Sequence, residues 1–203
     1  MKGKKVIQMN DGIFDKFIIQ ELVNKAESNN SNAQACLGYV YEEGLCGKID
    51  FSKAIEWYTK SAEQGNIFAQ INLGHIYNPV EGTEENLIKS FEWYKKAAEQ
   101  GNPDAQFLVA SILYHPRYSK VIESDITKRY GNAFEWCKKA TEQNNAYAQY
   151  TIAYCYRQGL GCKKSYKNST LWNTKAKESL TQEYLSTLDL LNCLPTFFIR
   201  PPP

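Results

Sequence analysis

The sequence contains few of the residues from which metal and catalytic sites are usually built. Only two histidines are present, His75 and His115, and they lie forty residues apart. The six cysteines form no Cys-x-x-Cys motif, so their spacing does not suggest a zinc site. Phosphate-binding and dinucleotide-binding loops are also missing. We therefore expect no metal, no cofactor and no enzymatic activity, although a hydrolase with a cysteine and a histidine brought together by folding stays open as an alternative.

Long apolar segments and an excess of one charge are missing as well. No stretch approaches the roughly 20 apolar residues of a transmembrane helix, and the N-terminus never develops the apolar core of a secretory signal. A formal net charge of +2, from 24 basic and 22 acidic residues, gives no general indication of nucleic-acid binding. We expect a cytoplasmic monomer that binds neither membranes nor nucleic acid, with free, buried thiols.

The sequence does contain an internal repeat. The dipeptide Ala-Gln recurs at steps of 36, 36 and 43 residues, beginning at Ala33, Ala69, Ala105 and Ala148. A tryptophan follows each alanine after 24, 24, 31 and 24 residues, at Trp57, Trp93, Trp136 and Trp172. All four tryptophans of the chain therefore occupy the same position in their units, and the third unit carries seven extra residues.

Each unit is predicted to form two helices. The first begins near Ser31-Asn32 in the first unit and at Asn102-Pro103 in the third, because Asn caps a helix and Pro suits its first position. The second carries the tryptophan and ends at a residue suited to the left-handed conformation, such as Gly65. We expect the tryptophans to be buried between successive units, where replacement by Ala costs about 3–5 kcal/mol.

These units predict an all-α fold, a right-handed α-solenoid of stacked helix-turn-helix repeats that forms a single domain over residues 1–203. Amphipathic residues at the N-terminus and apolar residues after Trp172 predict a capping helix at each end. The predicted divisions are an N-terminal capping helix at 12–30, repeats at 31–66, 67–102, 103–145 and 146–180, and a C-terminal cap and tail at 181–203.

The repeated pattern resembles the Sel1-like repeat, a relative of the tetratricopeptide repeat. The pattern is Ala-Gln-x-x-Leu-Gly-x-x-Tyr, then a turn with Gly, then Lys-Ala-x-x-Trp-Tyr, and the first unit matches it from Ala33 to Gly65. The resemblance covers roughly residues 30–180, and the fourth unit departs most because it lacks Lys-Ala before Trp172. It implies an adaptor or scaffold that binds other proteins, with the first helices lining an inner, concave wall.

The outward side of each first helix is the predicted partner-binding surface. At 100° per residue, offsets −1, +2, +6 and +9 from the alanine lie away from the packing face. Such a stripe should be mostly polar, yet here it is rich in the aromatic residues that anchor interfaces. We predict that a protein or peptide partner contacts Tyr39, Phe68, Ile71, His75, Phe107, Tyr147, Tyr150, Tyr154 and Arg157.

Several alternatives stay open at this point. Strong curvature of the solenoid would instead bury these rings against each other. An immunity or antagonist protein that blocks a toxin or effector would use the same surface as an adaptor. The basic cluster Arg157, Lys163, Lys164 and Lys167 either attracts an acidic partner or is simply solvated. The insertion at residues 115–130 is either a second contact loop or a neutral insertion.

Overall fold

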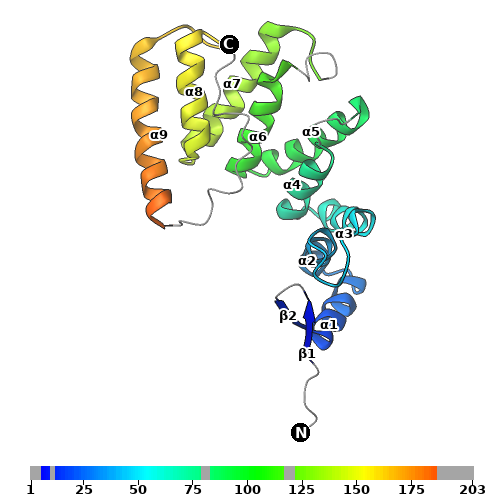
Figure 1. Ribbon diagram of the computed structural model, residues 1–203. Coiled ribbons are helices and arrows are strands. Elements are labelled where there is room, and N and C mark those ends of the chain that lie inside the picture. The colour runs from blue at the N-terminus through cyan, green and yellow to red at the C-terminus, as the bar shows by residue number, and fades with distance from the viewer. Residues whose placement is uncertain (1–5, 10–11, 79–82, 117–121, 187–203) are drawn as a thin grey trace.

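The computed structural model describes residues 6–9, 12–78, 83–116 and 122–186. Helices dominate this part of the chain and follow one another along an arc (Figure 1). The elements are β1 (Val6–Met9), β2 (Gly12–Asp15), α1 (Lys16–Glu27), α2 (Ser31–Glu42), α3 (Phe51–Glu63), α4 (Ile67–Ile76), α5 (Glu84–Glu99), α6 (Pro103–Tyr114), α7 (Ile126–Glu142), α8 (Ala146–Gln158) and α9 (Tyr166–Ser186).

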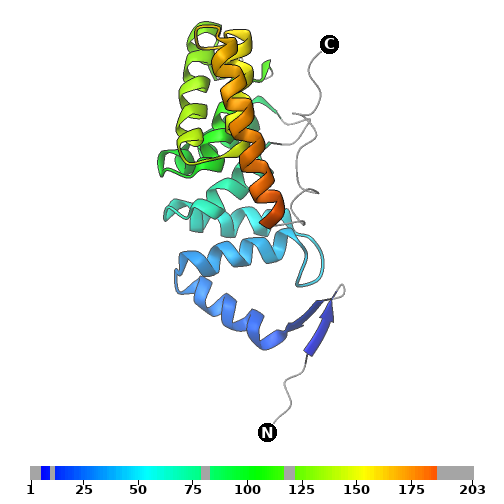
Figure 2. The same cartoon turned by 90° about the vertical axis from the view of Figure 1, so that its left-hand side faces the viewer.

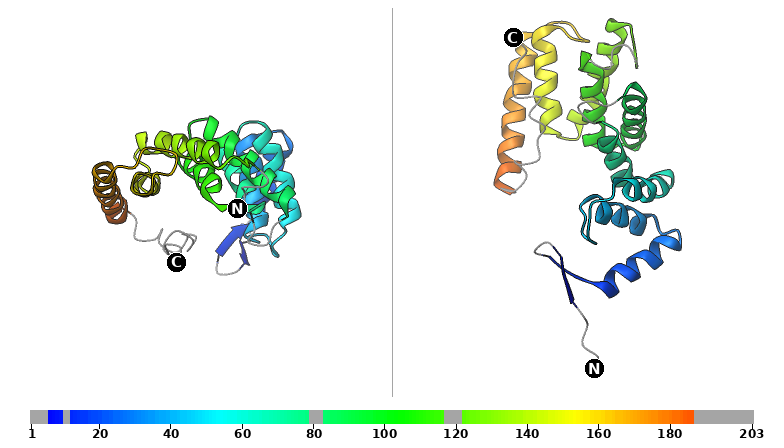
Figure 3. Two further views of the ribbon diagram at one scale, coloured as in Figure 1. Left: turned by 90° about the horizontal axis from the view of Figure 1, so that it is seen from above. Right: turned by 45° about the vertical axis from the view of Figure 1, so that its right-hand side comes forward.

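The predicted solenoid is confirmed. Each helix packs against the next one in the chain, from α1 to α9. The helix axes turn from nearly horizontal in the first units to steep at α9 (Figure 2). Seen from above, the helices form an open curve (Figure 3). In Figure 1, α2 and α4 lie on the side toward which the chain curves, and α3 and α5 lie on the outer side.

The N-terminal segment differs from the predicted capping helix. Residues 12–15, which we expected to be helical, form β2 and pair antiparallel with β1, with Val6 opposite Asp15. The helix begins only at Lys16. The sequence Asn-Asp-Gly at positions 10–12 is typical of a hairpin connection between two short apolar segments, which explains the difference. Helix α1 does cover the first unit, because Ile19, Leu22 and Val23 pack against the buried side chains of α2.

Asparagine caps the first helix of every unit. The side-chain oxygens of Asn30, Asn66, Asn102 and Asn145 accept hydrogen bonds of 2.8–3.0 Å from the backbone N–H three residues later. The cap of the first unit is therefore Asn30 and not the predicted Ser31-Asn32, because α2 begins one residue after Asn30. Residues in the left-handed conformation follow the second helices, at Gly65, Gly101 and Asn144, as predicted.

The glutamine of each Ala-Gln pair joins neighbouring helices through buried hydrogen bonds. Gln70 is 3% exposed; its Nε2 donates to the carbonyl oxygen of Ala62 at 3.0 Å, and its Oε1 accepts from Gln100 at 2.7 Å. The same two contacts recur around Gln34 and Gln106. Since a buried amide needs partners, these contacts give a physical reason for the glutamine in each unit.

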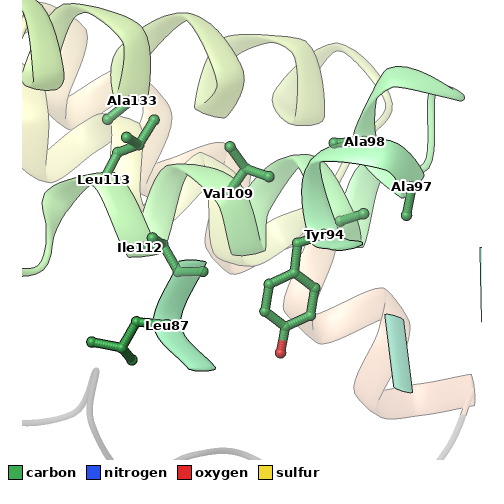
Figure 4. Close-up of a cluster of buried hydrophobic side chains, with 9 residues drawn as sticks. Leu87, Tyr94, Ala97, Ala98, Val109, Ile112, Leu113 and Ala133 are labelled. Atoms are coloured by element: carbon green, nitrogen blue, oxygen red, sulfur yellow. The ribbon is translucent and has the colours of Figure 1, made fainter. Parts of the chain in front are cut away.

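Tyrosines on the second helices fill the core of the first two units. Tyr58 and Tyr94 are almost completely buried, and each ring lies over the backbone of a glycine on the preceding first helix, Gly38 or Gly74. In the third unit the equivalent positions are Cys137 and Ala110, both fully buried. Figure 4 shows Tyr94 among the aliphatic side chains of α5, α6 and α7, with its hydroxyl pointing away from them.

The prediction that the tryptophans are buried between successive units is wrong. Each is only half-buried at the edge of a core cluster. A lysine three residues later covers each ring, with Nζ 3.8–4.6 Å from the ring centroid for Trp57, Trp93, Trp136 and Trp172. The next residue, tyrosine in the first two units, takes the buried position, because it lies at the centre of the face formed by the small residues of the helix.

Candidate partner-binding surface

The predicted surface residues lie on α4, α6, α8 and the second half of α2, and packing leaves their side chains outward. In each unit the alanine, the residue four positions later and the small residue after it are buried against the neighbouring helices. The stripe positions therefore lie on the other side of the helix. The alternative that the rings bury one another does not hold for Tyr39, Phe68, Tyr150 and Tyr154, whereas Phe107 and Tyr147 are half-buried against each other.

Exposure differs along this surface. Tyr39, Phe68, Tyr150 and Tyr154 are 44%, 51%, 57% and 42% exposed. Those fractions are large for aromatic residues in a folded chain, and aromatic side chains with this much free area are suited to anchoring a partner. The charged or polar members His75 and Arg157 are also exposed, whereas the remaining three, Ile71, Phe107 and Tyr147, are half-buried.

Aromatic contacts join successive units in two places. The rings of Tyr39 and Phe68 meet edge to face, with centroids 6.4 Å apart, across the first and second units. Phe107 and Tyr147 lie 6.0 Å apart across the third and fourth units. Such contacts hold the rings in fixed orientations, so less side-chain entropy is lost when a partner binds. The structure thus gathers four of the predicted residues into two pre-arranged aromatic groups.

Three predicted residues also have a structural role. Phe107 packs against the core cluster shared by α6, α7 and α8. Ile71 packs against the core cluster shared by α5, α6 and α7. His75 places its Nδ1 2.8 Å from the hydroxyl of the buried Tyr94. The protein around the imidazole lowers the pKa of His75, because desolvation disfavours the charged form. The ring is therefore neutral at neutral pH, and substitution of any of the three residues would disturb packing as well as the surface.

The cysteines offer no activated nucleophile in the described part of the chain. Burial raises the pKa of Cys137 well above its ordinary value, and the thiol donates a 3.2 Å hydrogen bond to the carbonyl oxygen of Ala148. Burial also raises the pKa of Cys155, to about 12. Both thiols therefore stay protonated at neutral pH, whereas nucleophilic cysteines need a lowered pKa. The prediction of buried thiols is wrong for Cys36 and Cys46, which are exposed.

Other kinds of site can be assessed for the described residues. Within ranges 6–9, 12–78, 83–116 and 122–186, His, Cys, Asp and Glu side chains form no group of three that could hold a metal ion. In the same ranges, no helix is both long and apolar enough to cross a membrane. Cys193 and residues 117–121 of the insertion lie outside the described residues.

Sequence reasoning missed three residues outside the predicted stripe. Tyr166, at the start of α9, is 65% exposed, and Leu171 on the same helix is 51% exposed. Arg129 on α7 is 3% exposed, yet its Nε and Nη1 have no hydrogen-bond partner. The count of lysine and arginine between residues 143 and 177 would have drawn attention to the neighbourhood of Tyr166, but no pattern in the sequence predicts that Arg129 is buried.

The repeat units agree with a known family. The family model described as Sel1 repeat matches residues 31–66, 67–102, 103–145 and 146–178, which is well over half of the chain. The chain belongs to the Sel1 repeat family. Sel1 repeats generally serve as protein–protein interaction modules, and the proteins that carry them are typically non-catalytic scaffolds. Among curated proteins, no sequence matches this chain.

Two solved Sel1 repeat structures are similar to this chain. A protective antigen present in uropathogenic Escherichia coli strains is 36% identical, with a TM-score of 0.66 over 79% of this chain. This chain spans 33% of that antigen, about a third of its length. A Sel1 repeat protein from Oxalobacter formigenes is 25% identical, with a TM-score of 0.63 over 79% of this chain and 69% of its own. Both similarities support the solenoid fold.

Proposed function

We propose that this Sel1 repeat protein is a non-catalytic adaptor that holds a protein or peptide partner along the exposed faces of its first helices. The observation that carries the proposal is the exposure of Tyr39, Phe68, Tyr150 and Tyr154 on the outward sides of the first helices of the first, second and fourth units. An ordinary helix presents polar residues to solvent. A row of large rings that is held in place but not covered is therefore best explained by a partner.

The two aromatic groups favour an extended partner over a compact one. Tyr39 and Phe68 lie between the first two units, and Phe107 and Tyr147 lie between the last two. A segment that reaches both groups must run along the inner side of the arc seen in Figure 1. An antagonist that blocks its partner would use the same surface, so that role stays an alternative, and the cytoplasmic location and monomeric state stay predictions.

The test is affinity capture with two double variants of the whole chain. Phe107→Ala with Tyr150→Ala removes rings from the proposed surface, whereas Ile88→Ala with Leu171→Ala removes exposed apolar side chains from second helices. Circular dichroism first establishes that both variants keep the helical content of the unmodified protein. We expect the unmodified chain and the second variant to retain the same partner and the first to lose it. Equal capture by all three proteins would refute the proposed surface.

A further inference from the structure

The net charge of the chain is small, but its basic and acidic residues are distributed unevenly along the sequence. Between residues 143 and 177 the sequence has six basic residues and no acidic one. The remaining 18 basic residues are outnumbered by 22 acidic ones, so the rest of the chain carries a net charge of −4. The fourth unit and the start of its cap therefore form a basic end on an otherwise acidic solenoid, which favours an acidic ligand at this end.

Part of this charge lies beside exposed aromatic rings. Tyr150, Tyr154 and Arg157 are four and three residues apart on α8, so they share one face of the helix. The turn that follows carries Lys163 and Lys164, both exposed. The Nζ of Lys164 lies 5.2 Å from the ring centroid of Tyr166, which is 65% exposed. The end of the α8–α9 hairpin thus presents rings and cations together.

These cations have no carboxylate partner in the described structure. All ion pairs found among residues 6–9, 12–78, 83–116 and 122–186 are formed by residues in the segment of the chain from Glu21 to Lys128. None involves Arg157, Lys163, Lys164 or Lys167, and all four side chains are exposed. Elsewhere on this chain, lysines pair with nearby carboxylates on their own helices, for example Lys60 with Glu56. The basic end therefore keeps its charge available for a ligand.

A buried cation lies next to the same turn. Gly161 packs so closely against the carbonyl oxygen of Tyr130 that a Cβ atom there would overlap it. The guanidinium of Arg129 lies 5.3 Å from the ring centroid of Tyr130. Within the described residues no carboxylate pairs with Arg129, and two of its N–H groups lack an acceptor. Since an unneutralised buried charge is costly, Arg129 adds positive potential where an anionic group from outside would relieve it.

We propose that the end of the α8–α9 hairpin binds an acidic segment of the protein partner. Aspartate or glutamate side chains of that segment pair with Arg157, Lys163 and Lys164, and its apolar groups lie on Tyr150 and Tyr154. This inference rests on the proposed adaptor function and states the chemistry of the partner at one end. Charge complementarity of this kind mainly steers association and fixes the direction in which a partner lies.

The charge of the other units favours an acidic peptide over a nucleic acid. Glu43 and Asp104 are exposed on the first and third units, and the chain outside residues 143–177 is acidic overall. A nucleic acid carries a phosphate at every nucleotide, so any part that extends along the solenoid would be repelled. A protein segment avoids this repulsion, because its acidic residues need occur only where it meets the fourth unit.

The test uses defined probes and the full chain. We would measure the fluorescence anisotropy of a labelled peptide with eight consecutive glutamates, of the same peptide with glutamines, and of an eight-nucleotide oligothymidylate. The variant Lys163→Glu with Lys164→Glu reverses the proposed site. The control variant Lys48→Glu with Lys95→Glu makes the same change in charge at exposed positions of the first two units. Thermal unfolding of each variant shows whether it remains folded.

We expect the glutamate peptide to bind at 50 mM salt, the glutamine peptide not to bind, and the reversal at 163 and 164 to weaken binding about tenfold more than the control. About 500 mM salt should remove most of the binding, because the Debye length then falls below about 5 Å. Equal weakening by both variants, absence of glutamate-peptide binding, or tighter binding of oligothymidylate would each overturn the proposal.

Failure of this inference can be told apart from failure of the adaptor function. Phe68→Ala alters the first aromatic group, far along the chain from the basic end, and should leave binding of the glutamate peptide unchanged. If the peptide does not bind but Phe107→Ala with Tyr150→Ala still abolishes capture of the partner, only the acidic-segment proposal is wrong. If the peptide binds and capture is unaffected by the aromatic variant, the aromatic surface is wrong instead.

Discussion

The contact between Gly38 and Tyr58 gives the most stringent test of how these units pack. A Cβ atom added at Gly38 would lie 2.5 Å from Cδ1 and 2.7 Å from Cε1 of the Tyr58 ring. Ordinary carbon contacts lie near 3.5–4.0 Å, so one side must move by about 1 Å. Tyr58 is fully buried, and its hydroxyl donates a 2.6 Å hydrogen bond to Glu42, so the ring has no free direction in which to move.

The expected loss of stability follows from two opposing effects. Alanine is favoured over glycine inside a helix by about 0.5–1 kcal/mol, which stabilises Gly38→Ala. Overpacking of a tight core costs about 1–3 kcal/mol, and the overlap with a fixed ring belongs at the upper end of that range. We therefore expect Gly38→Ala to destabilise the protein by about 1–2 kcal/mol. Gly131→Ala is the matched control, because Gly131 lies inside α7 with no heavy atom within 4 Å of the added Cβ, and it should stabilise by about 0.5–1 kcal/mol.

The third unit indicates how the clash can be relieved. There Ala110 and Cys137 replace the glycine and the tyrosine, and both are fully buried. Tyr58→Cys alone should cost about 3–5 kcal/mol because it removes a buried ring. Added to that variant, Gly38→Ala should no longer be destabilising, since the ring is absent and the methyl group occupies part of the cavity. The coupling energy of the two substitutions should therefore be about 1–3 kcal/mol.

Urea unfolding followed by circular dichroism measures all four proteins of this cycle. Repeat proteins unfold in more than one step when their units are loosely coupled. If the unfolding curve shows two steps, each step should be fitted separately. A Gly38→Ala variant at least as stable as the unmodified chain would refute the reasoning. Strict additivity of Gly38→Ala and Tyr58→Cys would do so as well, because it would mean that the glycine is not required by the ring.

The remaining predictions concern neighbouring features of the core. Tyr94→Ala should destabilise by about 3–5 kcal/mol and Trp93→Ala by clearly less, because only the tyrosine is fully buried; urea midpoints compare them. Gln70→Ala should cost about 1–3 kcal/mol, since it removes the two hydrogen bonds of a buried amide, one to the carbonyl oxygen of Ala62 and one from Gln100, and thermal unfolding measures it. A thiol reagent at pH 8 should label Cys36 in the folded protein, whereas Cys155 should react only after unfolding. Burial raises the pKa of Cys155 from 9.0 to about 12, so its contribution to stability is present below pH 9 and is lost as pH rises toward 12; urea midpoints at pH 8 and 11 test this sign.

The fold could be predicted because each sequence feature, although weak evidence by itself, recurs in every repeat. One Ala-Gln pair says little, but four in register with four tryptophans define the length of the unit and the two helices in it. The hairpin of β1 and β2 was missed because it occurs once, and its turn signal at residues 10–12 was outweighed by the amphipathic pattern that follows. Local turn chemistry carries information that periodicity does not.

The position of the tryptophans shows where periodicity was misapplied. Ala54, Ser61 and Ala62 are buried, and Tyr58 lies four residues after the first of them, in the centre of the same face. Trp57 lies one residue earlier and therefore about 100° around the helix, at the edge of that face. The recurrence of a large residue at one position of every unit therefore does not mean that the position is buried.

The candidate surface was predictable in its helices but not in its contacts. Helical geometry alone places Tyr150 away from the packing face, whereas Phe107 also packs against the core cluster of α6, α7 and α8. Whether rings of successive units meet depends on the rotation between units, which the sequence does not specify. The structure pairs Tyr39 with Phe68 and Phe107 with Tyr147, but it places His75 on Tyr94 instead. A difference of this kind decides which residues are free for a partner and which are shared with the core.

The contrast between buried and exposed positions is the strongest reason to place binding on the first helices. The buried alanine and glutamine are the same in all four units, because every unit must make the same contacts with its neighbours. Six residues after the alanine stand Tyr39, His75, Ser111 and Tyr154, four positions with three different residue types. No common packing requirement acts on them, so packing does not explain why large rings are kept exposed at two of the four. A partner that meets each unit with different chemistry does explain it, and the basic end of the solenoid fits the same explanation.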